Sequence, residues 1–387
     1  MSEYQYYEFQ AVDRPLTKDE LAELRALSSR ATITPTRFVN VYNFGDFRGD
    51  PLALMEHYFD LHVYVANWGT HQFMLRLPRA LLDPDAVAPY RVEYGVEVHA
   101  GGDDVILEFI SQDEEGGSWE ESGEEWLPDL LPLRDALADG DLRALYLGWL
   151  ACVVSGVLED EAAREPPVPP GLGALTAPLA ALARFLRVDD DLLAVAAERS
   201  APARATRPLA DDLARWVRDL PAAEKDALLL RVLEGDERHL HAELRRRARE
   251  ALAARTPDPA TVAGGRTVGE LLAVAEERTR ERQRQEAERA ARERARRDRE
   301  EAAARAAYLE HLAPRQDATW RAAEALIETK QPAKYDQAVQ LLVDLRDVSA
   351  RQQTTAAYRQ RLADLRARHA TKRSLHSRLD HAGLSGG

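Results

Sequence analysis

The stretch from Val268 to Leu312 constrains the fold more than any other part of the chain. It contains no proline and no glycine after Gly269, and between Val274 and Tyr308 its only apolar side chains are alanines. Alanine, arginine, glutamate and glutamine favour helices, and Glu and Arg recur here three and four residues apart, where opposite charges attract along a helix. The pattern predicts one continuous helix, roughly 65 Å long at 1.5 Å per residue.

The alanine-only centre limits what can pack against this helix. A coiled coil needs apolar residues at its a and d positions over several heptads, and the central turns offer only alanine. We therefore expect a solvated spacer, with antiparallel packing or self-association through the alanine stripe as alternatives. Its arginines could also contact phosphates, but the interleaved glutamates oppose such binding.

The composition of the whole chain is that of a soluble protein. Its 387 residues suit two or three domains, and 45% apolar residues with 30% charged residues support cores beneath a polar surface. No apolar run reaches the roughly 20 residues of a membrane span, and the start lacks the basic and apolar regions of a signal peptide. The lone Cys152 excludes an internal disulfide and a multi-cysteine zinc site. We predict a cytoplasmic protein that does not contact a membrane.

Charge is divided unevenly along the chain. Residues 266–387 carry 25 Lys and Arg against 19 Asp and Glu, whereas the preceding 265 residues carry 27 against 47. Such a division indicates either a tail that faces nucleic acid or two parts that attract each other.

Strand patterns concentrate in residues 1–112. Strands are predicted at Tyr4–Val12, Phe38–Tyr42, Leu61–Ala66, Gln72–Leu77, Val92–Val98 and Asp104–Ile110. A capping box from Thr17 to Glu20 predicts the start of one helix, and Asp50-Pro51 predicts the start of another. The order of elements predicts an α+β sandwich with helices on one face of a mixed or antiparallel sheet.

The remaining sequence is predicted to be helical, so the fold class is mainly α with an N-terminal α+β domain. An acidic loop and helices packed on that domain are expected at 113–165, and the proline-rich residues 159–170 are predicted to be a linker. A helical domain follows at 171–256. The long charged helix is expected at 267–312 and a small C-terminal helical module at 314–387.

Residues 320–342 resemble a single tetratricopeptide-type helix pair, through Trp320, Tyr335, Ala338 and Leu342. One such unit expects neighbours because it cannot bury its own faces, and the resemblance implies a helical surface that binds protein.

The tail also resembles a second family. Tyr335–Asp347, Leu362–Lys372 and Ser374–Leu384 are similar to the C-terminal tail of bacterial SWIM-type zinc-finger proteins, and the whole chain resembles actinobacterial hypothetical proteins. The zinc finger itself is absent, because Cys152 cannot supply its ligand set. The resemblance implies a shared helical module and carries over no zinc or nucleic-acid function.

Two aromatic and polar loops in the N-terminal domain are candidate binding surfaces. One carries Asp46, Arg48 and Asp50, and the other carries Trp68 and His71. Loops of this kind on a rigid sheet are common binding surfaces, although Gly and Asp also serve as plain turn residues.

The acidic loop and the basic tail are two further candidates. Trp119 and Trp126 in the acidic loop could receive a basic partner, including this chain's own tail, or the loop is simply solvated. Residues 351–378 hold eight Lys and Arg against one acid, and the candidate nucleic-acid contacts are Arg366, Arg368, Lys372 and Arg373. A solvated face, or a surface that docks the acidic body, is the alternative.

No catalytic signature is present. The sequence contains no phosphate-binding loop, no HExxH and no GxSxG, and Gly171-Leu-Gly173 lacks a third glycine. The histidines at 57, 62, 71 and 99 are too scattered to indicate a metal site. We therefore predict no catalytic, cofactor-binding or metal-binding residue. The leading hypothesis is a non-catalytic interaction or scaffold protein whose rigid charged helix separates two binding ends, with a protein partner or self-association through the long helix. The alternative is a nucleic-acid-associated protein that binds through residues 351–378. An enzyme with an unfamiliar site in the α+β domain is a third possibility.

Overall fold

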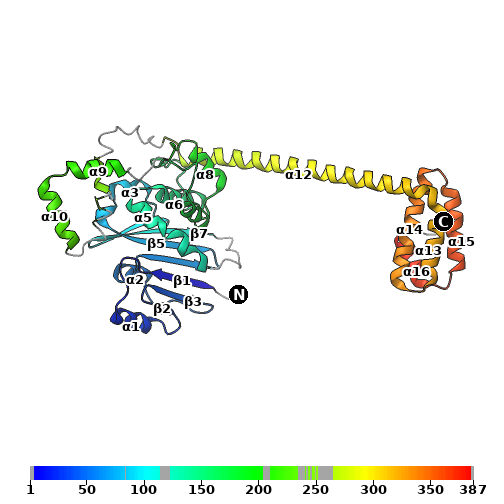
Figure 1. Cartoon of the computed structure of the whole chain (residues 1–387), viewed down its shortest axis with the longest axis horizontal. Helices are drawn as coiled ribbons and strands as arrows, with labels where there is room; N and C mark the ends of the chain where they lie inside the picture. Colours follow the sequence, from blue (N-terminus) through cyan, green and yellow to red (C-terminus); the bar gives the residue numbers. More distant parts are fainter. Residues whose placement is uncertain are drawn as a thin grey trace. The chain divides into compact units, whose positions relative to one another are not determined.

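The computed structural model divides the chain into two compact units, Met1–Glu281 and Arg282–Gly387. It describes residues 4–82, 84–113, 123–203, 210–233, 240, 243–244, 246–248, 250–251 and 265–384. The prediction of a mainly helical chain with an N-terminal α+β domain is confirmed (Figure 1). Within the described residues, no helix combines the length and the apolar character that crossing a membrane requires.

The first unit is built on a seven-stranded sheet in the order β2-β3-β1-β4-β5-β7-β6. Every neighbouring pair of strands is antiparallel. The strands are β1 (Gln5–Gln10), β2 (Thr32–Thr34), β3 (Arg37–Tyr42), β4 (Leu61–Ala66), β5 (Thr70–Pro78), β6 (Val96–Gly101) and β7 (Asp104–Gln112). Because β1 pairs with both β3 and β4, the N-terminal strand lies inside the sheet.

Helices cover both faces of this sheet, so the expectation of helices on one face is wrong. Leu75 and Leu107 face a large core formed with α4 (Trp126–Leu130), α5 (Pro132–Ala138), α6 (Arg143–Val154), α7 (Ala177–Phe185) and α8 (Asp190–Ala197). Met74 and Ile106 face a smaller core under α1 (Lys18–Leu27) and α2 (Pro51–His57). Neighbouring side chains on a strand point to opposite faces, so strands with consecutive apolar residues, such as Phe73–Leu75 and Val105–Leu107, require cover on both faces.

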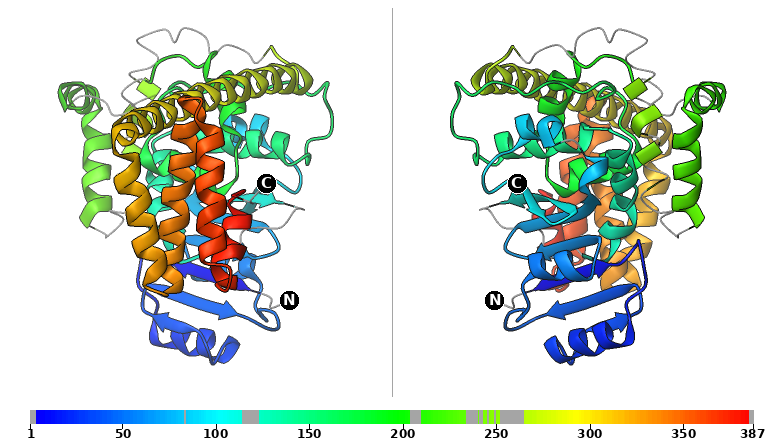
Figure 2. Two further views of the ribbon diagram at one scale, coloured as in Figure 1. Left: turned by 90° about the vertical axis from the view of Figure 1, so that its right-hand side faces the viewer. Right: turned by 90° about the vertical axis from the view of Figure 1, so that its left-hand side faces the viewer.

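Local signals placed several elements correctly. The side chain of Thr17 accepts from the backbone of Glu20 and the Glu20 side chain accepts from the backbone of Thr17, which is the predicted capping box. In Figures 1 and 2 the resulting helix α1, in dark blue, lies at the sheet edge formed by β2 and β3. The short β2 was not predicted. Strand β6 begins at Val96, not at Val92, because residues 92–95 form a tight turn with Tyr94 at φ +64°.

The segment expected to be a linker is packed into the first unit. Its Val168 is buried in the large core, together with Leu182 and Phe185 of the helices that follow it. Its backbone pairs with the start of the long helix, since Glu165 donates to Arg266 O and Val268 donates to Ala163 O. Prolines here fix an extended chain that crosses a core, and residues 171–197 share that core instead of forming their own.

The described residues before the long helix also include α3 (Pro84–Val87), α9 (Ala210–Asp219) and α10 (Ala222–Leu233). The last part of the helical domain predicted at 171–256 lies largely outside the described residues.

The predicted long helix is present as α12 (Val268–Leu312). Its first turn is capped reciprocally by Thr267 and Glu270. Val268, Leu271 and Ala275 belong to the large core of the first unit, whereas residues 282–304 are all exposed.

The second unit is a bundle formed by α13 (Gln316–Glu328), α14 (Pro332–Arg351), α15 (Thr355–Arg368) and α16 (Arg373–His381). These orange to red helices lie side by side (Figure 2). Trp320, Tyr335, Ala338 and Leu342 are all buried in its core. The residues that suggested a tetratricopeptide-type pair are therefore packing residues of a small bundle.

Candidate binding site at one end of the sheet

The two candidate loops of the N-terminal domain lie at the same end of the sheet. Tyr42, where the first loop begins, and Ala66, where the second begins, are both register partners of Gln5 on β1. Strands β3 and β4 therefore end on either side of the start of β1. Residues separated by more than 20 positions in sequence thus share one end of the fold.

A cavity of about 380 Å³ opens beside the first loop. Asp46 and Arg48, both predicted as binding residues, line it. The residues around it are Leu27, Ser28, Ser29, Arg30, Tyr42, Phe44, Gly45, Asp46 and Arg48. The wall thus combines two guanidinium groups, one carboxylate and several hydroxyls with an exposed phenyl ring, a set that suits a charged or polar group.

A buried polar side chain, that of Asn40, is hydrogen-bonded to two residues that line this cavity. Asn40 is only 2% exposed, and its amide nitrogen donates to Ser28 Oγ at 2.9 Å and to the Tyr42 hydroxyl at 2.7 Å. Its amide oxygen has no hydrogen-bond partner. An unpaired buried oxygen costs about 1–3 kcal/mol, so this part of the fold is held at some expense of stability. Sequence reasoning missed Asn40 and Ser28, because their contact depends on how β3 lies against the end of α1.

Gln5 connects the loop to the sheet. Its side-chain nitrogen donates to Asp46 Oδ1 and to Gly45 O, both at 3.2 Å, and its side-chain oxygen accepts from the Tyr7 hydroxyl at 2.7 Å. Burial raises the pKa of Tyr7 and of Tyr64 above the ordinary phenol value. Both phenols therefore stay protonated at neutral pH and act as hydrogen-bond donors, not as bases.

Three other predicted residues of these loops have different surroundings. Asp50 caps α2 through a 3.0 Å hydrogen bond from the backbone of Leu52. Trp68 is 44% exposed at the turn between β4 and β5. His71 is buried, with Nδ1 2.7 Å from Phe185 O and its ring stacked on Phe185. Of the three, Trp68 and Asp50 are exposed to solvent and His71 is not.

The two residues predicted in the acidic loop are Trp119 and Trp126. Trp119 lies outside the described residues. Trp126 begins α4 and packs edge-on against Phe185, with the Arg184 guanidinium 5.8 Å from its ring centroid. The contacts of Trp126 are those of a packing residue.

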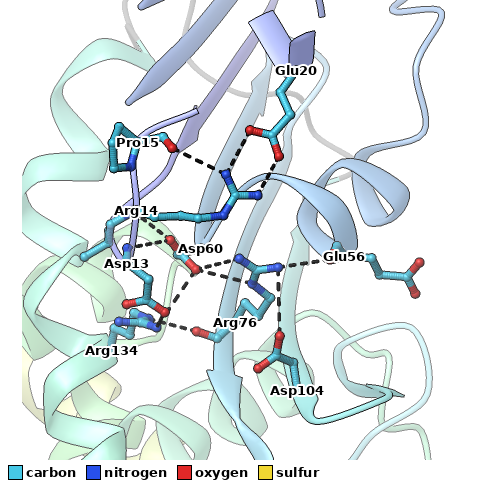
Figure 3. Close-up of polar contacts among 10 residues, drawn as sticks. Asp13, Arg14, Pro15, Glu20, Glu56, Asp60, Arg76, Asp104 and Arg134 are labelled. Carbon is cyan, nitrogen blue, oxygen red and sulfur yellow. Dashed lines mark hydrogen bonds and ion pairs between the residues drawn. The ribbon is translucent and has the colours of Figure 1, made fainter. Parts of the chain in front are cut away.

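Asp60 is the centre of a second polar cluster (Figure 3). It is 1% exposed, and it accepts from the backbone of Val12 at 2.6 Å and of Asp13 at 2.9 Å and from Arg76 Nη2 at 2.9 Å. Burial alone would raise the pKa of Asp60, but these donors and the Arg76 charge lower it below its ordinary value. Arg134 adds a 2.6 Å contact to Asp13. The cluster joins the loop after β1, the residue before β4, strand β5 and helix α5.

Four of the eight basic side chains of residues 351–378 form ion pairs within the second unit. Arg366 pairs with Asp380 at 2.9 Å, and Arg368 pairs with Glu324 at 2.6 Å. Lys372 donates to Ile327 O at 2.8 Å. Among the four predicted contacts, only the Arg373 side chain makes neither an ion pair nor a hydrogen bond in the described residues. The positive charges therefore tie helices together and do not form one free stripe.

Neither Cys152 nor His62 has the character of a catalytic residue. Cys152 is buried, which raises its pKa to about 12, and its Sγ contacts Gly148 O. Burial lowers the pKa of His62 to about 4, so its ring is neutral at physiological pH. His57 is exposed on α2, and His99 faces two glutamates on the outer strands.

Comparison with protein-family models, with curated proteins and with solved structures gave no match. The family resemblances described for the sequence therefore stay predictions.

Proposed function

We propose that this protein is a non-catalytic interaction protein, in which the charged helix α12 separates two binding ends. The observation that carries the proposal is the setting of α12 itself. Its first turns belong to the core of the first unit, residues 282–304 are exposed throughout, and Leu309 and Leu312 pack with Val348 of the second unit.

The exposed centre of α12 is stabilised from within the helix. Ion pairs one turn apart join Arg282 to Glu286, Glu288 to Arg292, Glu293 to Arg297 and Arg296 to Glu300. Each pair is worth only about 0.3–0.5 kcal/mol, so propensity and anchored ends must supply the rest. A helix that spends over 20 residues in solvent without burying a face suits a spacer, because it contributes length and little packing.

The cavity beside Asp46 and Arg48 is the better defined of the two proposed binding ends. Its mixed charge suits a polar or charged side chain of a protein partner. Phe44, 74% exposed at its rim, supplies apolar contact area of the kind that protein interfaces favour. The helical surface of α13–α16 is the other proposed end.

Site-directed crosslinking to protein partners would test the proposal. A photo-crosslinking residue placed at Phe44 or at Arg359 of α15, in the intact chain, is expected to capture different proteins from an extract of the producing cells. Arg48→Glu is expected to abolish capture at Phe44 and to leave capture at Arg359 unchanged. Capture that ignores Arg48→Glu would contradict a binding end at the cavity. Turnover of a substrate that one carboxylate or histidine substitution abolishes would overturn the non-catalytic assignment.

The nucleic-acid alternative requires its own measurement, because the pairing of Arg366 and Arg368 argues against it. The intact chain would be titrated with labelled DNA and RNA at low and at physiological salt. We expect no binding at physiological salt. Binding that falls steeply with salt and is weakened by Arg373→Ala would instead place the nucleic-acid role first.

A further inference from the structure

Three side chains with metal-binding chemistry meet on the outer hairpin formed by β6 and β7. Glu97 and His99 are two positions apart on β6, so both point to the same face of the sheet. Glu108 on β7 is the register partner of Glu97. Sequence spacing hides the group, because Glu108 joins it only through the pairing of the strands.

The ligand atoms of these three side chains all lie within 4.8 Å of one another. His99 Nε2 is 2.5 Å from Glu108 Oε2. The side-chain amide of Gln72, on β5, donates to the other carboxylate oxygen of Glu108. The backbone N–H of Tyr94 donates to Glu97 Oε1 at 3.0 Å. Each glutamate thus has one oxygen held by a donor from outside the group, the usual arrangement when outer groups orient metal ligands.

The charge of the group is not balanced by protein cations. Glu97 and Glu108 are like charges directly opposite each other on paired strands, which destabilises a sheet. Glu108 is only 7% exposed, which adds a desolvation cost. Within the described residues, no Lys or Arg makes an ion pair with either carboxylate, and His99 is the sole basic side chain in contact. A bound divalent cation would supply the missing charge.

We propose that Glu97, His99 and Glu108 bind a divalent transition-metal ion, with Zn²⁺ as the best match. An imidazole nitrogen favours Zn²⁺ and its neighbours over Mg²⁺ and Ca²⁺, which prefer all-oxygen sites. Three protein ligands leave one tetrahedral position for water or for a group of a ligand. The site is independent of the binding ends proposed above.

Binding requires a small rearrangement of the side chains. Two ligand atoms that each lie about 2.0–2.1 Å from a tetrahedral Zn²⁺ are about 3.3 Å apart. His99 Nε2 and Glu108 Oε2 must therefore separate by roughly 1 Å, while Glu97 closes in. In the structure His99 Nε2 and Glu108 Oε2 share a hydrogen bond, and the metal ion would replace the proton between them.

Calorimetric titration of the chelator-treated intact chain with Zn²⁺ tests the proposal. We expect one tight site per chain, and no binding to Glu97→Gln or His99→Gln at metal concentrations that saturate the parent. Gln72→Leu, which removes the group orienting Glu108, should weaken binding about tenfold or more. Co²⁺ substitution should give the absorption spectrum of a tetrahedral ion in the parent and not in His99→Gln.

Matched controls separate this site from binding elsewhere. Glu93→Gln changes an exposed acid next to the hairpin, and His57→Gln changes an exposed histidine of the same unit; neither should alter the affinity. Circular dichroism and thermal unfolding without metal would show that each variant is folded. Binding retained in the Glu97→Gln, His99→Gln double variant would overturn the proposal, because other histidines would then hold the ion. Absence of binding to the parent would reduce the group to an ion pair between His99 and Glu108.

Discussion

Glu165 has a fully buried side chain, and it accepts hydrogen bonds from Tyr146 at 2.5 Å and from Arg266 at 2.7 Å and 2.9 Å. Burial raises the pKa of Tyr146, and the contact with Glu165 raises it further, so this phenol remains a donor to the carboxylate. The three groups join α6, the segment after it and Arg266, which lies two residues before α12. Removing one partner of a buried ion pair destabilises the fold strongly, because it leaves an uncompensated charge in the interior. This loss is larger than the net stabilisation that the intact pair provides.

Removing the partner of Glu165 should therefore destabilise the first unit strongly. Arg266→Met is expected to lower the free energy of unfolding in urea by about 3–5 kcal/mol, because it leaves a buried carboxylate unpaired. Arg278→Met is the control, since its pair with Glu198 is exposed and should contribute below about 1 kcal/mol. Equal losses for the two variants would contradict the importance of burial.

His62 should make stability depend on pH. Its pKa is about 4 in the folded chain and about 6.5 when unfolded, so below pH 6.5 the unfolded chain gains a proton that the folded chain does not. Stability is therefore complete above pH 6.5 and is lost as the pH falls toward 4, by up to about 3 kcal/mol. His62→Gln should lose less stability between pH 7 and pH 4.5 in urea unfolding, whereas the exposed His57→Gln should behave like the parent. An unchanged pH dependence in His62→Gln would contradict a neutral buried ring.

At the residue scale, the sequence predicted the features that depend on residues close together in the chain. The caps by Thr17 and Asp50 depend on contacts within three positions. The role of His71 could not be predicted, because its partner Phe185 is 114 positions away. Asp46 and Arg48 were named from composition alone, and the cavity they line depends on the distant end of α1.

The elements of the chain differ in how much they depend on the rest of the fold. The centre of α12 is the extreme case, since its ion pairs and its propensity lie within the helix. The short β2 depends on its pairing with β3, and the extended segment of residues 159–170 depends on its packing against the large core. Local sequence therefore predicted α12 fully and predicted β2 not at all.

Removing charge from the centre of α12 should loosen that region alone. Combining Glu288→Gln with Glu293→Gln deletes two ion pairs, each worth about 0.3–0.5 kcal/mol. Amide hydrogen exchange near residues 286–299 should become faster by a few-fold, with no change in the strands. Glu301→Gln, which lies on the same helix and makes no ion pair in the described residues, should have no effect. Faster exchange in the sheet would contradict a self-supported centre.

For the molecule as a whole, the two compact units imply two cooperative transitions. Trp320 lies in the core of the second unit, with its ring 5.6 Å from that of Tyr358. Trp320→Ala should destabilise this unit by about 3–5 kcal/mol and lower one calorimetric transition, leaving the other in place. Leu75→Ala in the first unit should have the converse effect. A common shift of both transitions would contradict independent units.

The overall fold class followed from periodicity and composition, whereas the boundaries inside the first unit did not. Prolines at residues 166–170 indicated a linker, but proline reports only an extended backbone without a donor. Whether such a chain is exposed or crosses a core depends on Val168 and Leu172, which are buried here beside Leu182. The proposed binding cavity and the proposed metal site depend on distant loops and paired strands, and those pairings are absent from the pattern of the sequence.

The capped start of α12 has a consequence for how the chain folds during synthesis. Domains generally begin to fold while the ribosome is still extending the chain. Val268, Leu271 and Ala275 belong to the core that the sheet and α4–α8 share. Arg266, just before them in the sequence, neutralises the buried Glu165. A nascent chain that stops before residue 266 therefore holds an open core and an unpaired buried acid. The sheet domain can complete its core only after the start of the long helix has been synthesised, so the first folded unit emerges already joined to α12.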